Sequence, residues 1–300
     1  MAHARRTMML GMMMAAVGVA GIYPTRDAAA AGVSDRIHAL PLLHDSLLGI
    51  SGKLRARFLP MIEAAEMERA LGDLRASFVP GTVAPRVASL QVLSMLPFET
   101  KIAGRMGLYR MGYWPGERRP LRTLGYAMPS GFVQVTLDNQ DMQVSEHFRL
   151  RDFVTKDQFA VWPKYVVLRE PLLDKLELTL DELARTGYPV AHLQVMSGFR
   201  HPAYNALGIG AGGRATESRH QYGDAADVFP DSDRDGRTDD LNGDGRVNAR
   251  DVELIIRAVE RVEAAHPELN GGLGRYHATN AHGPFVHIDV RGTTARWGGA

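Results

Sequence analysis

The clearest periodic pattern in the chain lies in 170–186, where Leu recurs at positions 173, 176, 180 and 183. This spacing of three and four residues predicts an amphipathic helix, and Pro171 near its first turn and Gly187 after its end mark the boundaries. The segment 132–137 alternates in a strand-like way, and 190–196 is also typical of a strand. A helix followed by a strand therefore leads into the last third of the chain.

The N-terminal half is harder to interpret. Residues 33–80 are rich in Leu, Ala, Glu and Arg, and Pro60 interrupts an otherwise helical pattern. We expect two or three helices here, ending before Pro80. The segment 101–122 instead has six basic residues against one acid, interleaved with Tyr and Trp. It is compatible with a loop that holds a polyanion or a glycan, although a solvated linker whose aromatic rings pack on the core is the favoured interpretation.

The first residues have the order of a secretory signal. His3, Arg5 and Arg6 precede an uncharged run from residue 7 to 23, and a tract of small residues follows at 28–32. We therefore expect a signal peptide over 1–31 and an exported, periplasmic or extracellular protein, by the general or the twin-arginine route. An uncleaved anchor is the alternative, although the run is shorter than the roughly 20 residues that span a bilayer. No later segment is long and apolar enough to span.

Composition limits the kinds of partner and of metal site that the chain can have. The chain has 300 residues, enough for two domains, and its formal charge is 35 − 34 = +1, so no global basic field favours nucleic-acid binding. It contains no cysteine. Disulfides, thiolate metal sites and cysteine nucleophiles are thereby excluded, and any metal must be held by His, Asp, Glu or carbonyl oxygen.

Polar residues of the metal-binding types gather after residue 196. Six residues separate His220 from Asp227, Gly223 and two alanines among them, a spacing that suits a loop turning into a buried strand. His287 lies in a second apolar, strand-like run. Two imidazoles and one carboxylate leave a fourth position open for water, which is the arrangement of a catalytic zinc ion rather than a structural one.

These segments resemble a known family. Ser-Gly-Phe-Arg-His-Pro at 197–202, the Ser-x-His-x-x-Gly-x-Ala-x-Asp string at 218–227, and Phe-Val-His-Ile-Asp at 285–289 before Trp297 are similar to the zinc D-Ala-D-Ala carboxypeptidase and murein endopeptidase family, which shares its fold with the Hedgehog signalling domain. The segment 144–153 resembles the start of the same domain. The resemblance implies an α+β domain over 144–300, with an antiparallel sheet carrying the zinc and helices flanking it. A mainly helical or loop-rich region of unknown role, 32–143, would precede it.

The resemblance also implies roles for single residues. His220, Asp227 and His287 would be the zinc ligands, and Arg200 would orient the substrate carbonyl or stabilise the oxyanion, which suits its fixed guanidinium fork. Ser218 would bind the terminal carboxylate of the substrate, with turn capping as the alternative.

The general base departs from the family pattern. Several relatives place Glu, Asp or His two or three residues before the last histidine ligand, where this chain has Phe285 and Pro284. His282 and Asp289 are the available substitutes. On an alternating strand Asp289 shares a face with His287, so it can instead orient the imidazole. We favour His282 as the acid–base group.

An acidic insert at 231–251 suggests calcium. Counting from Asp240, ligands fall at the EF-hand positions and a helix follows from residue 252, as in dockerin modules. The residues of this loop are Asp240, Asn242, Asp244, Arg246 through its carbonyl, Asn248 and Asp251. An overlapping candidate with Asp231, Asp233, Asp235 and Asp239 resembles thrombospondin-type repeats. The alternative for both is a solvated acidic loop, and bound calcium would be structural.

The expected function is therefore an exported zinc metallopeptidase that cleaves peptide bonds of peptidoglycan, as a D,D-carboxypeptidase or an endopeptidase. A non-catalytic cell-wall binding or adhesion protein with structural zinc and calcium is the alternative, favoured by the missing acid before His287. A zinc hydrolase acting on another small amide is a third possibility.

Overall fold

The computed structural model describes residues 47–76, 85–118, 126–210 and 213–298, all of which belong to a unit that extends from His44 to Ala300. The expected signal peptide 1–31 lies outside the described residues, as do Arg119 and Arg122 of the basic segment. None of the helices within these ranges has the length and apolar content needed to cross a membrane.

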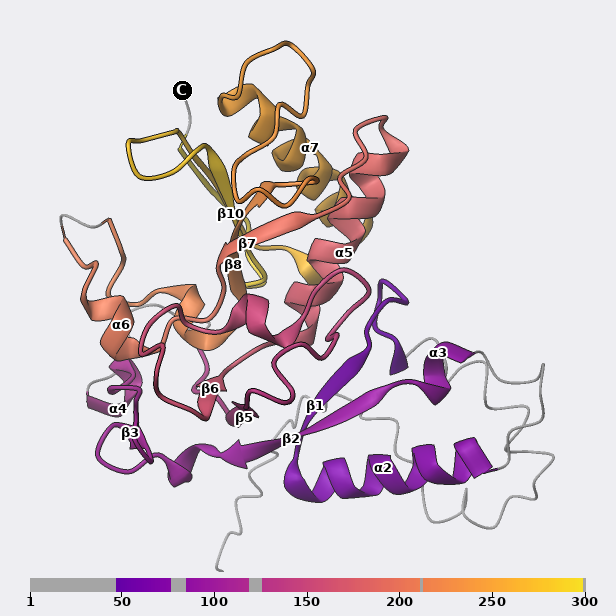
Figure 1. Ribbon diagram of the computed structural model, residues 1–300, viewed down its shortest axis with the longest axis vertical. Coiled ribbons are helices and arrows are strands. Elements are labelled where there is room, and N and C mark those ends of the chain that lie inside the picture. Colours follow the sequence, from indigo (N-terminus) through magenta and orange to yellow (C-terminus); the bar gives the residue numbers. More distant parts are fainter. Residues whose placement is uncertain (1–46, 77–84, 119–125, 211–212, 299–300) are drawn as a thin grey trace, which may run out of the picture. The chain divides into compact units, whose positions relative to one another are not determined.

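Helices and strands are interspersed along the described chain (Figure 1). In order, the elements are β1 (Ala56–Pro60), α2 (Met61–Ala76), α3 (Pro85–Ala88), β2 (Gln91–Pro97), η2 (Phe98–Thr100), β3 (Arg105–Met106), β4 (Tyr109–Arg110), α4 (Pro115–Arg118), β5 (Gly131–Val135), η3 (Leu150–Phe153), β6 (Lys164–Val166), α5 (Glu170–Arg185), β7 (Leu193–Ser197), α6 (Pro202–Ala206), η4 (Arg219–Tyr222), β8 (Ala225–Pro230), α7 (Ala249–Ala265), η5 (Pro267–Leu269), β9 (Gly272–Tyr276), β10 (Phe285–Asp289) and β11 (Ala295–Trp297).

The strands form sheets of mixed orientation. A five-stranded sheet has the order β11-β9-β10-β8-β7 and is antiparallel except for the parallel pair β9 and β11. A four-stranded sheet has the order β1-β2-β5-β6, in which β1 and β2 are parallel. The expectation of helices combined with a sheet is thus confirmed as a mixed α/β fold, but the antiparallel arrangement is not complete.

Of the two or three helices expected in 33–80, the described residues contain α2, and the segment before Pro60 forms the strand β1 instead of a helix. Residues 33–46 and 77–80 lie outside the described residues. Leu54, Ala56 and Phe58 are buried, whereas the alternate side chains of Arg55 and Arg57 form ion pairs with glutamates. This two-residue alternation is that of a half-buried strand. Pro60 lies at the junction between β1 and α2, where a missing backbone N–H donor costs least.

One hydrophobic cluster joins the two sides of the boundary expected at residue 144. It contains Leu54 and Phe132 from the N-terminal side together with Phe153, Phe199 and Ile288 from the C-terminal side. The region before residue 144 therefore shares its core with the region that carries the candidate metal ligands.

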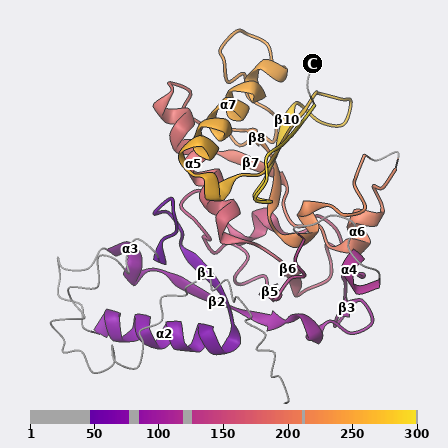
Figure 2. The same ribbon diagram turned by 180° about the vertical axis from the view of Figure 1, so that it is seen from behind.

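Helices α5 and α7 lie side by side next to the five-stranded sheet in both views (Figures 1 and 2), and α7 contacts β9 and β10. A buried lysine side chain links both helices to β10. Lys175 Nζ of α5 donates to Glu263 Oε1 of α7 at 2.6 Å and to the carbonyl oxygen of Asp289 at 2.8 Å. The two helices are thereby tied to the strand that carries His287.

Candidate metal centre

Pairing of β8 with β10 places two of the expected ligands together. Asp227 of β8 lies directly opposite His287 of β10 in the antiparallel ladder, so their side chains project from the same face of the sheet. His220 comes from η4, and Gly223 follows that helix as its C-cap residue. Gly223 has a φ of +70°, and a Cβ there would lie 2.4 Å from the carbonyl oxygen of Val167. Only glycine allows the chain to turn here from the η4 imidazole into β8.

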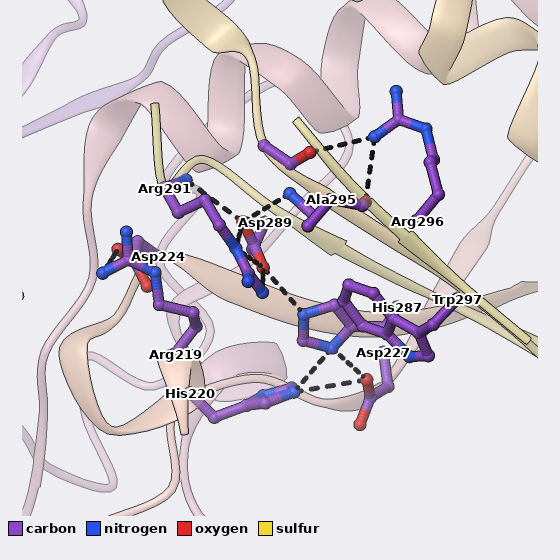
Figure 3. Close-up of polar contacts among 12 residues, drawn as sticks. Arg219, His220, Asp224, Asp227, His287, Asp289, Arg291, Ala295, Arg296 and Trp297 are labelled. Atoms are coloured by element: carbon purple, nitrogen blue, oxygen red, sulfur yellow. Dashed lines mark hydrogen bonds and ion pairs between the residues drawn. The ribbon is translucent and has the colours of Figure 1, made fainter. Parts of the chain in front are cut away.

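Three ligand atoms of these residues converge (Figure 3). His220 Nε2 lies 3.1 Å from His287 Nδ1, and Asp227 Oδ1 lies 2.9 Å from His287 Nδ1 and 3.2 Å from His220 Nε2. All three residues are buried. In a tetrahedral zinc site with metal–nitrogen distances near 2.0–2.1 Å, ligand atoms stand roughly 3.3 Å apart. The spacing and the donor types therefore fit a zinc ion.

The outer atoms of both imidazoles have partners that orient the rings. His220 Nδ1 donates to the carbonyl oxygen of Gly198 at 2.7 Å, and His287 Nε2 donates to Asp289 Oδ2 at 3.1 Å. These bonds place a proton on each outer nitrogen and leave His220 Nε2 and His287 Nδ1 directed at Asp227. Metal-binding histidines are commonly held in this way.

The local electrostatics match this arrangement. Burial lowers the pKa of His220 to about 4, so its imidazole is neutral at pH 7. Burial also opposes the charge on Asp227, but His220, His287 and Arg200 hold the pKa of that carboxyl well below its usual range. For His287, hydrogen bonds to two carboxylates outweigh burial and raise the pKa. A positive charge, either a proton or a cation, is therefore favoured between His287 and Asp227.

Arg200 contacts the same cluster. Its Nη2 forms an ion pair with Asp227 Oδ2, its Nε donates to Ser197 Oγ at 2.7 Å, and its backbone N–H donates to the carbonyl oxygen of His220 at 3.0 Å. A guanidinium has five N–H donors, so these two side-chain contacts leave donors for a further acceptor.

Ser218 lies immediately before η4, as its N-cap residue, and is 8% exposed. Its hydroxyl makes no capping hydrogen bond. The structure thus does not show the capping that was the alternative to a role in substrate binding.

The two candidates for the general base lie in different surroundings. Asp289 is fully buried, and its carboxylate accepts hydrogen bonds from the Gly272 N–H, from Arg291 and from His287. Its contacts are those of a residue that orients His287. His282 lies before β10, where Nδ1 donates to the Gly283 carbonyl oxygen at 2.8 Å and the ring meets Phe285 edge-on at 5.0 Å.

Two aromatic residues near the centre were not predicted as site residues from the sequence. Trp297 has its ring centroid 5.1 Å from that of His287, and its Nε1 donates to the Tyr276 hydroxyl at 2.9 Å. Tyr276 in turn stacks on Phe285 at 4.5 Å. No local spacing connects Tyr276 with the metal motifs. Its position follows only from the pairing of β9 with β10.

The basic segment divides into a buried and an open part. Tyr109 and Trp114 are fully buried, as expected for rings that pack on the core. Arg105, Arg110 and Arg118 instead line a cavity of about 470 Å³, together with Tyr113 and residues of α6.

The two acidic loops differ in which carboxylates lie close together. Carboxylate oxygens of Asp231, Asp233 and Asp239 lie within 4.8 Å of one another, whereas the fourth expected ligand of this loop, Asp235, is not in the group.

In the second loop, the acids of the expected EF-hand arrangement, Asp240, Asp244 and Asp251, form no such group within the described chain. Asp251 accepts backbone N–H bonds from Asn242 and Asn248, and Asn248 caps α7. The carbonyl oxygen of Arg246 accepts from Asn248 Nδ2 at 3.1 Å.

Comparison with protein-family models, with curated proteins and with solved structures found no match to this chain.

Proposed function

We propose that the protein is an exported zinc metallopeptidase that hydrolyses a peptide bond in the stem peptides or cross-links of peptidoglycan. The observation that carries the proposal is the convergence of His220 Nε2, Asp227 Oδ1 and His287 Nδ1, together with an outer partner on each imidazole. Three protein donors, all nitrogen or oxygen, suit a zinc ion with an open fourth position. The substrate class rests on the resemblance of 144–297 to the murein peptidases.

A bound zinc ion would supply a Lewis acid that polarises a carbonyl and lowers the pKa of water to about 7. The chain supplies the rest of the chemistry. The Gly198 carbonyl and Asp289 hold the two imidazoles, and the remaining donors of Arg200 are available to stabilise the oxyanion of a tetrahedral intermediate. Ser218 would bind the terminal carboxylate of the substrate.

Proton transfer is assigned to His282. Asp289 already accepts hydrogen bonds from His287, Arg291 and Gly272, so it acts by positioning His287. The bond from His282 Nδ1 to the Gly283 carbonyl oxygen leaves Nε2 as the proton acceptor. At this atom a proton could be taken from the attacking water and returned to the leaving amine.

The test is mass spectrometry of the products after incubation of the purified protein with peptidoglycan, with and without a zinc-selective chelator. We expect new muropeptides that disappear with chelator and return with zinc, and their masses would identify the bond. His220→Ala should abolish both hydrolysis and zinc binding. His266→Ala, a histidine at the end of α7, is the matched control and should retain both.

A non-catalytic cell-wall binding protein is the second candidate. Pro284 and Phe285 stand where several relatives carry the acidic or histidine base, and the cavity lined by Arg105, Arg110 and Arg118 offers a place for an anionic or glycan ligand. Stoichiometric zinc without any released product, combined with retention on sacculi, would favour this candidate and contradict the peptidase.

A further inference from the structure

Asp231 is a buried acid with one carboxylate oxygen that has no hydrogen-bond partner. It follows directly after β8, and its side chain is only 1% exposed. Oδ2 accepts the backbone N–H of Gly236 at 3.2 Å, whereas Oδ1 has no hydrogen-bond partner. Buried polar atoms nearly always have one, so Oδ1 calls for a ligand.

The surroundings of Asp231 indicate what that ligand is. A carboxylate oxygen of Asp231 lies within 4.8 Å of carboxylate oxygens of Asp233 and Asp239. Three carboxylates this close repel one another unless a cation lies between them. A donor set made only of oxygen favours a hard cation, and calcium accepts irregular geometry more readily than magnesium.

The neighbouring loop provides a contrast. Both oxygens of Asp240 accept backbone N–H bonds, from Gly243 and Gly245, and Asp251 is part of the capping box of α7. These carboxylates are satisfied by the chain itself. The sequence favours the Asp240 loop for calcium, whereas the unpartnered oxygen lies in the Asp231 loop.

The Asp231 loop is also tied to the strands of the metal centre. The Asp231 N–H donates to the His192 carbonyl oxygen just before β7, and the Asp239 N–H donates to that of Pro230 at the end of β8, both at 2.9 Å. Thr238 Oγ1 donates to the Pro284 carbonyl oxygen, immediately before β10, at 3.0 Å. The loop therefore contacts the end of β8, which carries Asp227, and the residue that precedes β10, which carries His287.

We propose that Asp231, Asp233 and Asp239 bind one calcium ion, and that this ion fixes the ends of β8 and β10 and thereby strengthens zinc binding at Asp227 and His287. The coupling rests on the proposed zinc centre, whereas the calcium site itself does not.

Calcium binding is tested first, by calorimetric titration of the full chain freed of metal ions. We expect one calcium ion per chain and a higher melting temperature in its presence. Asp231→Asn should weaken calcium binding at least about tenfold, and Asp244→Asn, the same substitution in the neighbouring loop, should leave it unchanged. Asp233→Asn, at an exposed position, should weaken it as well and serves if Asp231→Asn fails to fold. Absence of calcium binding, or its loss in Asp244→Asn alone, overturns the site.

Coupling is tested by measuring zinc affinity in competition with a chromophoric chelator, without calcium and at saturating calcium. We expect calcium to tighten zinc binding at least about fivefold, and zinc to tighten calcium binding by the same factor, because linkage is reciprocal. His287→Ala should bind calcium without any response to zinc. Equal zinc affinities at both calcium levels overturn the coupling alone. A wild-type chain that binds calcium but no zinc overturns the zinc centre and the coupling, and leaves the calcium site standing.

Discussion

His287 Nε2 lies 3.1 Å from Asp289 Oδ2, and the Asp289 carboxylate is itself fixed by the backbone N–H of Gly272 at 2.7 Å. Burial opposes the negative charge of Asp289, but the hydrogen bonds from His287 and Arg291 hold the pKa of that carboxyl far below its usual range. The imidazole is thus held by a carboxylate that stays ionised, with its Nδ1 facing Asp227.

Asp289→Asn should weaken zinc binding. The neutral amide no longer fixes the orientation and basicity of His287, and loss of such an outer partner typically costs 10–100-fold in metal affinity. Chelator competition measures the change, and a melting curve of the zinc-free variant separates it from a loss of folding. Asp138→Asn, at an exposed turn after β5, is the matched control. Equal zinc affinities of Asp289→Asn and wild type would contradict a positioning role.

Lys175→Met should destabilise the fold. Lys175 is completely buried and bonded to Glu263 and to the Asp289 carbonyl oxygen. Its removal takes one of two cationic partners from Glu263, which keeps its ion pair with Arg296, and takes the ammonium donor from the Asp289 carbonyl oxygen. Breaking a buried ion pair on one side typically costs about 3–5 kcal/mol of unfolding free energy. Urea denaturation provides the measurement. Arg185→Met removes an exposed ion pair at the end of the same helix and should change little. A Lys175 variant as stable as that control would show that the buried pair does not hold α5 and α7 on β10.

The contact of His147 with Glu177 predicts that the stability of the folded state depends on pH. This pair lies far in sequence from the candidate metal ligands. His147 Nδ1 lies 2.6 Å from Oε2 of the buried Glu177, and this hydrogen bond raises the pKa of the imidazole above 6.5. Protonation therefore stabilises the folded state fully below pH 6.5, and the contribution disappears as pH rises through the folded-state pKa. The melting temperature of His147→Ala should fall furthest below that of wild type near pH 5.5, and the difference should shrink by pH 8.5. A difference in melting temperature that grows with pH would contradict the predicted stabilisation by the His147–Glu177 pair.

Trp297 should report zinc binding. Its ring lies next to His287, so replacing the proton on that imidazole with zinc changes the electric field at the indole. We expect a change in tryptophan fluorescence that saturates at one equivalent of zinc. Trp297→Phe should remove the change, whereas Trp162→Phe, next to β6, should retain it. An unaltered zinc response in Trp297→Phe would place the signal elsewhere.

The candidate ligands His220, Asp227 and His287 could be predicted from the sequence because the motifs that contain them are short and local. His220 and Asp227 lie on one turn and strand, and His287 lies in an apolar run of its own, so the structure had only to pair β8 with β10. The α5 helix was equally accessible, since its Leu periodicity is uninterrupted. The β1 strand carried a usable signal in the alternation of Arg55 and Arg57 with buried residues, but five residues of alternation next to a long helical pattern are easily overlooked.

The remaining features depend on contacts distant in sequence. The capping role of Asp251 and the orphaned oxygen of Asp231 follow from how the acidic insert packs, and loop spacing alone predicts ligands in both cases. Burial of Lys175 in the middle of α5 depends on Glu263, 88 residues further along the chain. Tyr276 reaches the centre only through sheet pairing and ring stacking.

Because Asp227 lies opposite His287, the candidate ligands come together only when β8 and β10 pair in their native register. A slip of one residue between β8 and β10 would move one of the two side chains out of alignment and turn it to the opposite face of the sheet. Such a misregistered chain could still bury apolar residues, since Ala226, Val228, Val286 and Ile288 are all nonpolar. It could not gather three ligands. A metal ion bound at the proposed centre during folding would therefore favour the native strand alignment over such a slip.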